Sequence, residues 1–221
     1  MPRKMPTLDR FKLAGLIVLA LLPALTGAMS LSATASHLVL GTDGAGTDAA
    51  TYVARPVPIF THVIAGVAFA LLGAFQVIGS FRARHHRAHK ITGRALLPLG
   101  FIAALTALYM NEVFPPLLGP IKYYSNLGFG VVFLCALTLA TAALVGRKYA
   151  QHGAWMLRAY ALALGAGTQR LMFMPVFMVT GEIDPVTVGV ILILGWSINL
   201  LVAEWVIRKP LRKAKRQPAL A

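Results

Sequence analysis

Six long apolar stretches restrict what this chain can fold into. They run over about residues 13–35, 58–80, 95–112, 126–146, 158–179 and 186–207, each close to the roughly 20 residues that span a bilayer as a helix. Of the 221 residues, 57% are hydrophobic and 13% are charged, whereas about 25% are charged in a typical soluble domain. The sequence therefore predicts an all-α, polytopic membrane helix bundle with six transmembrane helices.

The connections between the stretches leave no room for a soluble module. We therefore predict a single transmembrane domain over residues 1–221, with a first helix at 13–35 and a basic cytoplasmic tail at 208–221. The small residues of SATASH, which end the first stretch, would suit signal-peptide cleavage. The apolar region of a signal peptide is shorter, however, at about 7–15 residues, so we expect this helix to be retained.

Basic residues are concentrated in alternate connections. Of the 21 Lys and Arg residues, all but Arg55, Lys122 and Arg170 lie in the N-terminal segment, in the connections after the second and fourth stretches, or in the tail. The positive-inside rule then places both termini in the cytoplasm, as in a multi-pass protein of the bacterial inner membrane. We interpret the net charge of +14 as a topology signal with attraction for anionic lipid headgroups, rather than as a nucleic-acid surface.

Polar and small residues share one face of the second stretch. At about 100° per residue, an arc of about 80° contains His62, Gly66, Phe69, Gly73, Gln76 and Ser80. Glycines on this face would allow neighbouring helices to approach closely, and polar side chains would be buried in the bundle. The pattern predicts that His62, near the outer end, and Gln76, near the inner end, point toward the bundle interior.

The fifth stretch has a similar pattern, with His152 and Arg170 on one narrow arc. Arg170 lies about 18 Å along the helix from Arg158, near the middle of the membrane. An unpaired arginine there costs about 3 kcal/mol or more. We therefore expect it to face inward, toward His62, Glu112 or a bound anionic group, and to act as an interhelical clamp or as a ligand or charge-transfer residue.

The sixth stretch carries two polar residues with expected partners. Asn199 is predicted to hydrogen-bond across helices, and Glu204 to pair with an arginine near the membrane surface such as Arg158, because a carboxylate at that depth needs compensation. The lone Cys135 excludes an intramolecular disulfide. We interpret it as a small core residue.

Histidines flank the third and fifth stretches on the cytoplasmic side. His89 and His152 both stand where a predicted helix begins, so they lie at matched depth and could ligate a haem b as a pair of imidazoles. A metal site of these two histidines and one further ligand is a second interpretation. The third is that they cap helices or contact lipid phosphate.

Several motifs resemble the bacterial membrane-protein family called domain of unknown function 2306 (DUF2306). These are His62 with Gln76, the segment HKITGR, an H-x-x-W-M-x-R element (His152, Trp155, Met156, Arg158) and a W-x-x-N-x-x-x-x-E element (Trp196, Asn199, Glu204). The resemblance covers roughly residues 58–208. It implies a multi-helix membrane protein and no established reaction, so it supports the topology and the choice of site residues.

Three functions fit these observations. The first is a redox protein that interacts with a quinone or carries haem, with His62 and Arg170 lining an outer pocket and His89 and His152 an inner one. The second is a small transporter or channel for an anionic or polar solute, with Arg170 in the pathway. The third is a structural or assembly subunit of a membrane complex, or a homo-oligomer. The candidate binding residues are His62, Gln76, His89, His152, Trp155, Arg158, Arg170, Asn199 and Glu204.

Overall fold

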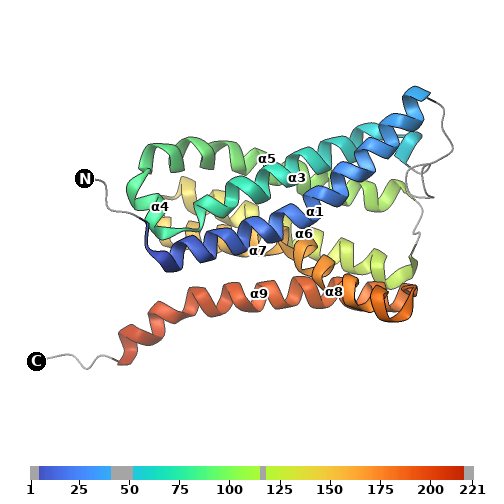
Figure 1. Cartoon of the computed structure of the whole chain (residues 1–221). Coiled ribbons are helices and arrows are strands. Elements are labelled where there is room, and N and C mark those ends of the chain that lie inside the picture. Colours follow the sequence, from blue (N-terminus) through green and yellow to red (C-terminus); the bar gives the residue numbers. More distant parts are fainter. Residues whose placement is uncertain (1–4, 41–51, 115–117, 217–221) are drawn as a thin grey trace, which may run out of the picture.

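Eight α-helices make up the part of the chain that the computed structural model describes, which is residues 5–40, 52–114 and 118–216. In chain order they are α1 (Thr7–Leu40), α3 (Pro56–Gln76), α4 (Gly79–Arg84), α5 (His86–Val113), α6 (Gly119–Val145), α7 (Tyr149–Ala163), α8 (Gly165–Thr180) and α9 (Pro185–Arg216). No strand occurs among these residues. Figure 1 shows the helices running side by side as a bundle.

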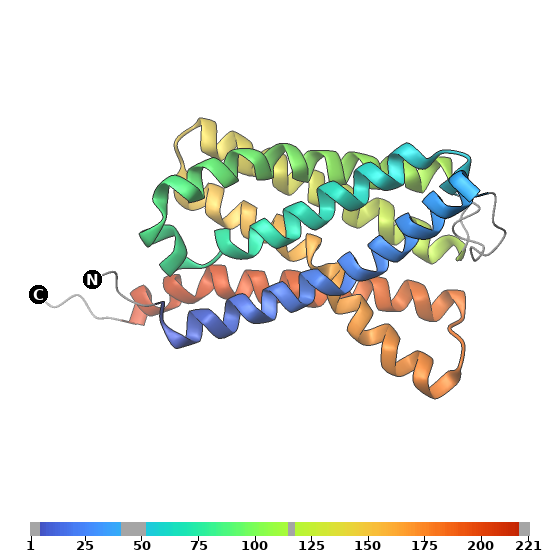
Figure 2. The same ribbon diagram turned by 45° about the horizontal axis from the view of Figure 1, so that its top comes forward.

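Six segments are long and apolar enough to cross a membrane: α1, α3, α5, α6, α7 together with α8, and α9. The predicted six-helix membrane fold is therefore confirmed. The start of α1, the short α4 and the end of α9 lie at the same end of the bundle (Figures 1 and 2). We call this the basic end, because α4 and the start of α5 carry Arg82, Arg84 and Arg87 there, and we call the other the opposite end. That the basic end faces the cytoplasm stays a prediction.

Large apolar side chains cover the outside of the bundle. Val39, Met178 and Val179 are 80%, 78% and 86% exposed, and similar residues are exposed on every long helix. Contiguous apolar surface of this extent is unfavourable in water but matches the acyl chains of a bilayer. The surface therefore agrees with the span lengths in indicating a lipid environment.

Helices α3, α5, α6 and α7, together with α1, form the core. Phe69, Leu96 and Leu137 are almost fully buried there among alanines. A Cβ atom on Gly73 would lie 2.5 Å from the Tyr160 ring, so the predicted close approach at Gly73 is confirmed. At Gly66 nothing lies within 4 Å, and the same prediction is wrong at that position because the helix there borders open space.

The fifth predicted helix is broken at Leu164. Helix α7 ends at Ala163, Leu164 forms a turn, and α8 begins at Gly165. Helix α7 packs against α3, α6 and α9, whereas α8 packs against α1 and α9, and Figure 2 shows α8 diverging from the rest of the bundle toward the opposite end. The continuous helix predicted over residues 158–179 is therefore wrong.

Other helix boundaries differ from the predicted ones in simple ways. Helix α3 ends at Gln76 instead of residue 80, because Ile78 adopts an extended conformation and the chain turns into α4. Helix α5 begins at His86 instead of residue 95, since polar residues continue the helix beyond the apolar stretch. Helices α1 and α9 likewise extend past the predicted limits, and α9 includes part of the predicted tail.

Asp184 fixes the start of α9. Its Oδ2 accepts a hydrogen bond from the Thr187 hydroxyl (2.5 Å), and its Oδ1 accepts from the backbone N–H groups of Val186 and Thr187 (2.9 and 3.1 Å). These bonds occupy N–H groups that have no partner within the helix. They also favour the charged carboxylate, so the Thr187 hydroxyl and the two N–H groups hold the pKa of Asp184 below its usual value.

Candidate functional site

A cavity of about 310 Å³ lies in the half of the bundle toward the opposite end. Its volume is at the lower limit of the roughly 300–1,000 Å³ typical of ligand pockets. Its wall includes Leu162 and Ala163 from the end of α7 and Ala166 from the first turn of α8. Because α7 stops inside the bundle and α8 turns away, the space ahead of α7 is left unfilled. The break in the helix therefore borders the cavity.

His62 supplies the imidazole of this cavity. Its Nδ1 lies 3.0 Å from the Ala103 carbonyl oxygen, and since a carbonyl only accepts, Nδ1 carries the proton and donates it. The Thr106 hydroxyl lies 3.4 Å from the same nitrogen but donates to the Ile102 carbonyl (2.6 Å). In its neutral form the ring therefore keeps an acceptor lone pair on Nε2, for which the described residues provide no hydrogen-bond partner.

Aromatic rings form much of the remaining wall. Phe129 and Trp196 lie with ring centroids 4.8 Å apart, tilted by 30°, and Phe133 packs edge-on against the buried Phe69 at 5.7 Å. Tyr52 and Phe114 meet at 5.0 Å where α3 begins and α5 ends. Aromatic and apolar lining of this kind suits a largely apolar ligand with an aromatic or planar group.

The polar groups of the cavity wall lie toward the opposite end of the bundle. They are Asn111, Lys122, Tyr123 and Asn126. The Tyr123 hydroxyl donates to both carboxylate oxygens of Glu112, at 3.0 and 3.1 Å, and Asn111 Nδ2 donates to the Tyr123 carbonyl at 3.4 Å. The cavity is therefore polar toward the opposite end of the bundle and apolar farther inside. An amphipathic molecule would bind in it with its polar group toward the opposite end.

Asn199 holds the two sides of the helix break together. Its Nδ2 donates to the Ala161 carbonyl of α7 (3.1 Å), and its Oδ1 accepts from the Thr168 hydroxyl of α8 (2.9 Å). The predicted hydrogen bonding of Asn199 across helices is therefore confirmed. Gln169, which is buried, adds a further bond from its Nε2 to the Leu192 carbonyl of α9 at 3.1 Å.

Close packing at glycines supports the same break. A Cβ atom on Gly165 would lie 2.1 Å from Cδ1 of Trp196, and one on Gly167 would lie 2.0 Å from the Leu19 carbonyl oxygen of α1. Both distances are far below van der Waals contact. Glycine at these two positions therefore allows α8 to pass between α1 and α9 and Trp196 to reach the cavity.

Arg170 does not line the cavity, so the prediction that it faces the interior with His62 is wrong. Its side chain is exposed, its Nε donates to Thr26 Oγ1 at 3.3 Å, and its guanidinium lies 6.0 Å from the Phe173 ring centroid. Neither His62 nor Glu112 is its hydrogen-bond partner, since these residues contact Ala103 and Tyr123. The break at Leu164 separates Arg170 from the face of α7 that carries His152.

The two histidines predicted to line an inner pocket, His89 and His152, lie at the basic end. His152 Nδ1 donates to the Ala140 carbonyl of α6 (2.9 Å). The Nδ1 atom of His89 is buried and has no hydrogen-bond partner among the described residues. Gln76 donates to Thr92 of α5, one turn beyond His89. Within the described residues no third histidine, cysteine or carboxylate completes a metal cluster, and haem b at His89 and His152 stays a prediction.

The predicted pairing of Arg158 with Glu204 is confirmed. Arg158 Nε lies 2.5 Å from Glu204 Oε1, its guanidinium stacks on the Trp155 ring at 4.3 Å, and Arg208 Nε approaches Glu204 Oε2 at 3.3 Å. These residues lie at the basic end, away from the cavity. Cys135 is exposed on α6, so its predicted core position is wrong, because a small apolar side chain can equally face lipid.

Comparison with known proteins identifies one family. The family model described as "Predicted membrane protein (DUF2306)" matches residues 59–207, which extend from α3 into α9. The matched range includes the helix break, the Arg158–Glu204 pair and the residues that line the cavity, except Tyr52. No curated protein and no solved structure matched the chain.

Proposed function

The chain belongs to the DUF2306 family of predicted membrane proteins, and from that premise we propose that its cavity binds the headgroup of a quinone or a similar planar, carbonyl-bearing lipophilic molecule. The observation that carries this proposal is the His62 ring, whose Nδ1 is held by the Ala103 carbonyl while Nε2 is left for a ligand in an aromatic-walled cavity. A quinol hydroxyl could donate to Nε2. A redox role in a bacterial inner membrane is part of the same proposal.

The first turn of α8 adds a complementary group. In this turn the N–H groups of Gly167 and Thr168 donate to the Leu164 carbonyl (3.0 and 3.3 Å), which leaves those of Gly165 and Ala166 without a backbone partner among the described residues. Ala166 lies on the cavity wall. A quinone carbonyl would accept a hydrogen bond there, while Nε2 of His62 would accept a hydrogen bond from a hydroxyl group of the reduced form. The cavity thus offers both a donor and an acceptor.

Fluorescence of Trp196 tests this proposal. We expect a short-chain benzoquinone, titrated into the purified protein, to quench fluorescence in a saturable way, and Trp196→Phe to remove that component. His62→Ala should weaken binding about threefold to tenfold, as expected for one lost hydrogen bond. His86→Ala, which changes an exposed histidine at the basic end, is the matched control. Linear quenching, or equal midpoints for His62→Ala and the unchanged protein, would contradict the proposal.

The broken helix also favours transport of a polar solute as a second candidate, because transporters build substrate sites from discontinuous helices near the middle of the membrane. A cysteine at Ala166 in a Cys135→Ser background separates the two functions. A transporter exposes that cysteine to a membrane-impermeant maleimide from either side in turn. A binding site that opens only at the opposite end gives labelling from that side alone.

A further inference from the structure

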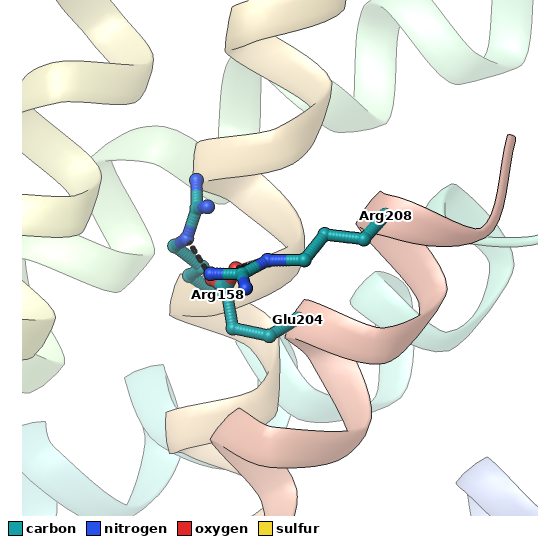
Figure 3. Close-up of polar contacts among 3 residues, drawn as sticks. All are labelled: Arg158, Glu204 and Arg208. Carbon is teal, nitrogen blue, oxygen red and sulfur yellow. Dashed lines mark hydrogen bonds and ion pairs between the residues drawn. The ribbon is translucent and has the colours of Figure 1, made fainter. Parts of the chain in front are cut away.

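At the basic end, α7 and α9 hold a charge cluster with an excess positive charge. Arg158 and Arg208 both approach the single carboxylate of Glu204, through Nε at 2.5 and 3.3 Å (Figure 3). Two guanidinium groups against one carboxylate leave one positive charge uncompensated. No other ion pair within the described residues involves these arginines.

Both guanidinium groups keep their terminal nitrogens available. Each arginine uses Nε toward Glu204, and no hydrogen bond from either NH₂ group to a described residue occurs. The Arg158 and Arg208 side chains are 23% and 66% exposed, respectively. Parallel N–H groups of a guanidinium match the oxygens of a phosphate, which they bind in a bidentate manner.

The surroundings of the cluster match a phospholipid rather than a soluble anion. On α9, Leu201, Trp205 and Arg208 lie at spacings of four and three residues, so they share one face, and all three are more than half exposed. Trp205 also carries Lys209 over its ring at 4.8 Å. A tryptophan with basic residues on one side and apolar residues on the other marks the level of the headgroups.

We propose that Arg158 and Arg208, oriented by Glu204, bind the phosphate of an anionic phospholipid whose acyl chains lie along the Leu201–Trp205 face of α9. The carboxylate holds the two guanidinium groups in place, and the excess charge favours a lipid with net negative charge. This inference is independent of the quinone proposal, because the cluster lies at the other end of the bundle from the cavity polar groups.

Thermal-shift titrations of the purified full-length chain in a neutral detergent test the proposal. Dioleoylphosphatidylglycerol should raise the melting temperature in a saturable way, whereas dioleoylphosphatidylcholine and inorganic phosphate should not. Arg208→Gln should weaken the phosphatidylglycerol effect about fivefold or more, the scale of one basic residue at a charged surface. Arg208→Lys keeps the positive charge but loses the bidentate guanidinium group. Its affinity for phosphatidylglycerol should lie between those of the unchanged protein and Arg208→Gln.

Arg87→Gln is the matched control, because it removes the same charge from an exposed position at the basic end. Equal losses in Arg87→Gln and Arg208→Gln would overturn the proposal in favour of a diffuse surface charge. An equal shift with phosphatidylcholine would overturn the requirement for an anion, and one with inorganic phosphate would assign the cluster to a soluble anion. Arg208 is exposed and lies near the end of α9, so its variants test binding in a folded protein.

Discussion

Gly167→Ala is expected to lower the free energy of unfolding by about 1–3 kcal/mol, the usual cost of forcing extra volume into a packed contact. The added Cβ would lie 2.0 Å from the carbonyl oxygen of Leu19. This neighbour is backbone and cannot rotate away as a flexible side chain can, so α1 and α8 must separate. Unfolding of the purified protein in mixed detergent micelles, followed by circular dichroism, measures the change.

Gly153→Ala provides the control for this result. Gly153 lies on α7, exposed, with nothing within 4 Å of the position of a Cβ atom. Alanine is favoured over glycine inside a helix by about 0.8–1.0 kcal/mol, so this variant should be as stable as the unchanged protein or more so. Equal destabilisation by the two substitutions would show that α1 does not pack on α8 at Gly167.

Asn199→Leu is expected to cost a similar amount, about 1–3 kcal/mol. The substitution removes two interhelical hydrogen bonds, each worth on average about 0.6 and at most about 1.7 kcal/mol in a membrane protein. It also leaves the Ala161 carbonyl without its partner at the helix break, and an unsatisfied buried polar group costs about 1–3 kcal/mol. The same unfolding measurement applies. Binding in the cavity should weaken as well, because Asn199 positions the helix break.

Two further variants, Thr168→Val and Ser197→Ala, serve as the comparison and the control for the stability of Asn199→Leu. Thr168→Val removes one of the two bonds and should cost less than Asn199→Leu. Ser197, two residues before Asn199 on α9, makes no side-chain hydrogen bond to a described residue, so Ser197→Ala should have little effect. A neutral Asn199→Leu beside a costly Ser197→Ala would contradict the described role of Asn199.

Charge in an apolar environment made parts of the structure predictable from sequence. A carboxylate near the lipid boundary must be compensated, which is why Glu204 could be matched to Arg158, and an amide inside the bundle must find a partner, as Asn199 does. The six spans follow from length and hydropathy alone. These features could be predicted because they depend only on the local sequence and on the apolar environment of the bilayer.

The helix break could not be predicted in the same way. The segment ALALGAG is apolar, and glycine is common in transmembrane helices, so a continuous helix was the simplest expectation. The break depends on distant contacts, of Gly165 with Trp196 and of Gly167 with Leu19. Angles counted along a continuous helix no longer hold beyond Leu164, which is why Arg170 was assigned to the wrong face.

The cavity was predictable only in part. His62 was singled out from the polar face of its helix, and it does line the cavity. Asn111, Lys122, Tyr123 and Asn126 were missed as ligand-contacting residues, because they flank a connection and resemble ordinary interface residues. The cluster of tyrosines and polar residues in KYYSN was the available signal. Their grouping depends on how the end of α5 and the start of α6 meet.

The exposed guanidinium of Arg170 has a consequence for the bilayer itself. It lies ten residues before the end of α8 at Thr180, about 15 Å along the axis, with only Thr26 and the Phe173 ring described beside it. A cation at such depth draws water and headgroups toward itself. The leaflet should therefore be locally thinned and hydrated along α1 and α8, and the protein should prefer membranes that deform easily on this side.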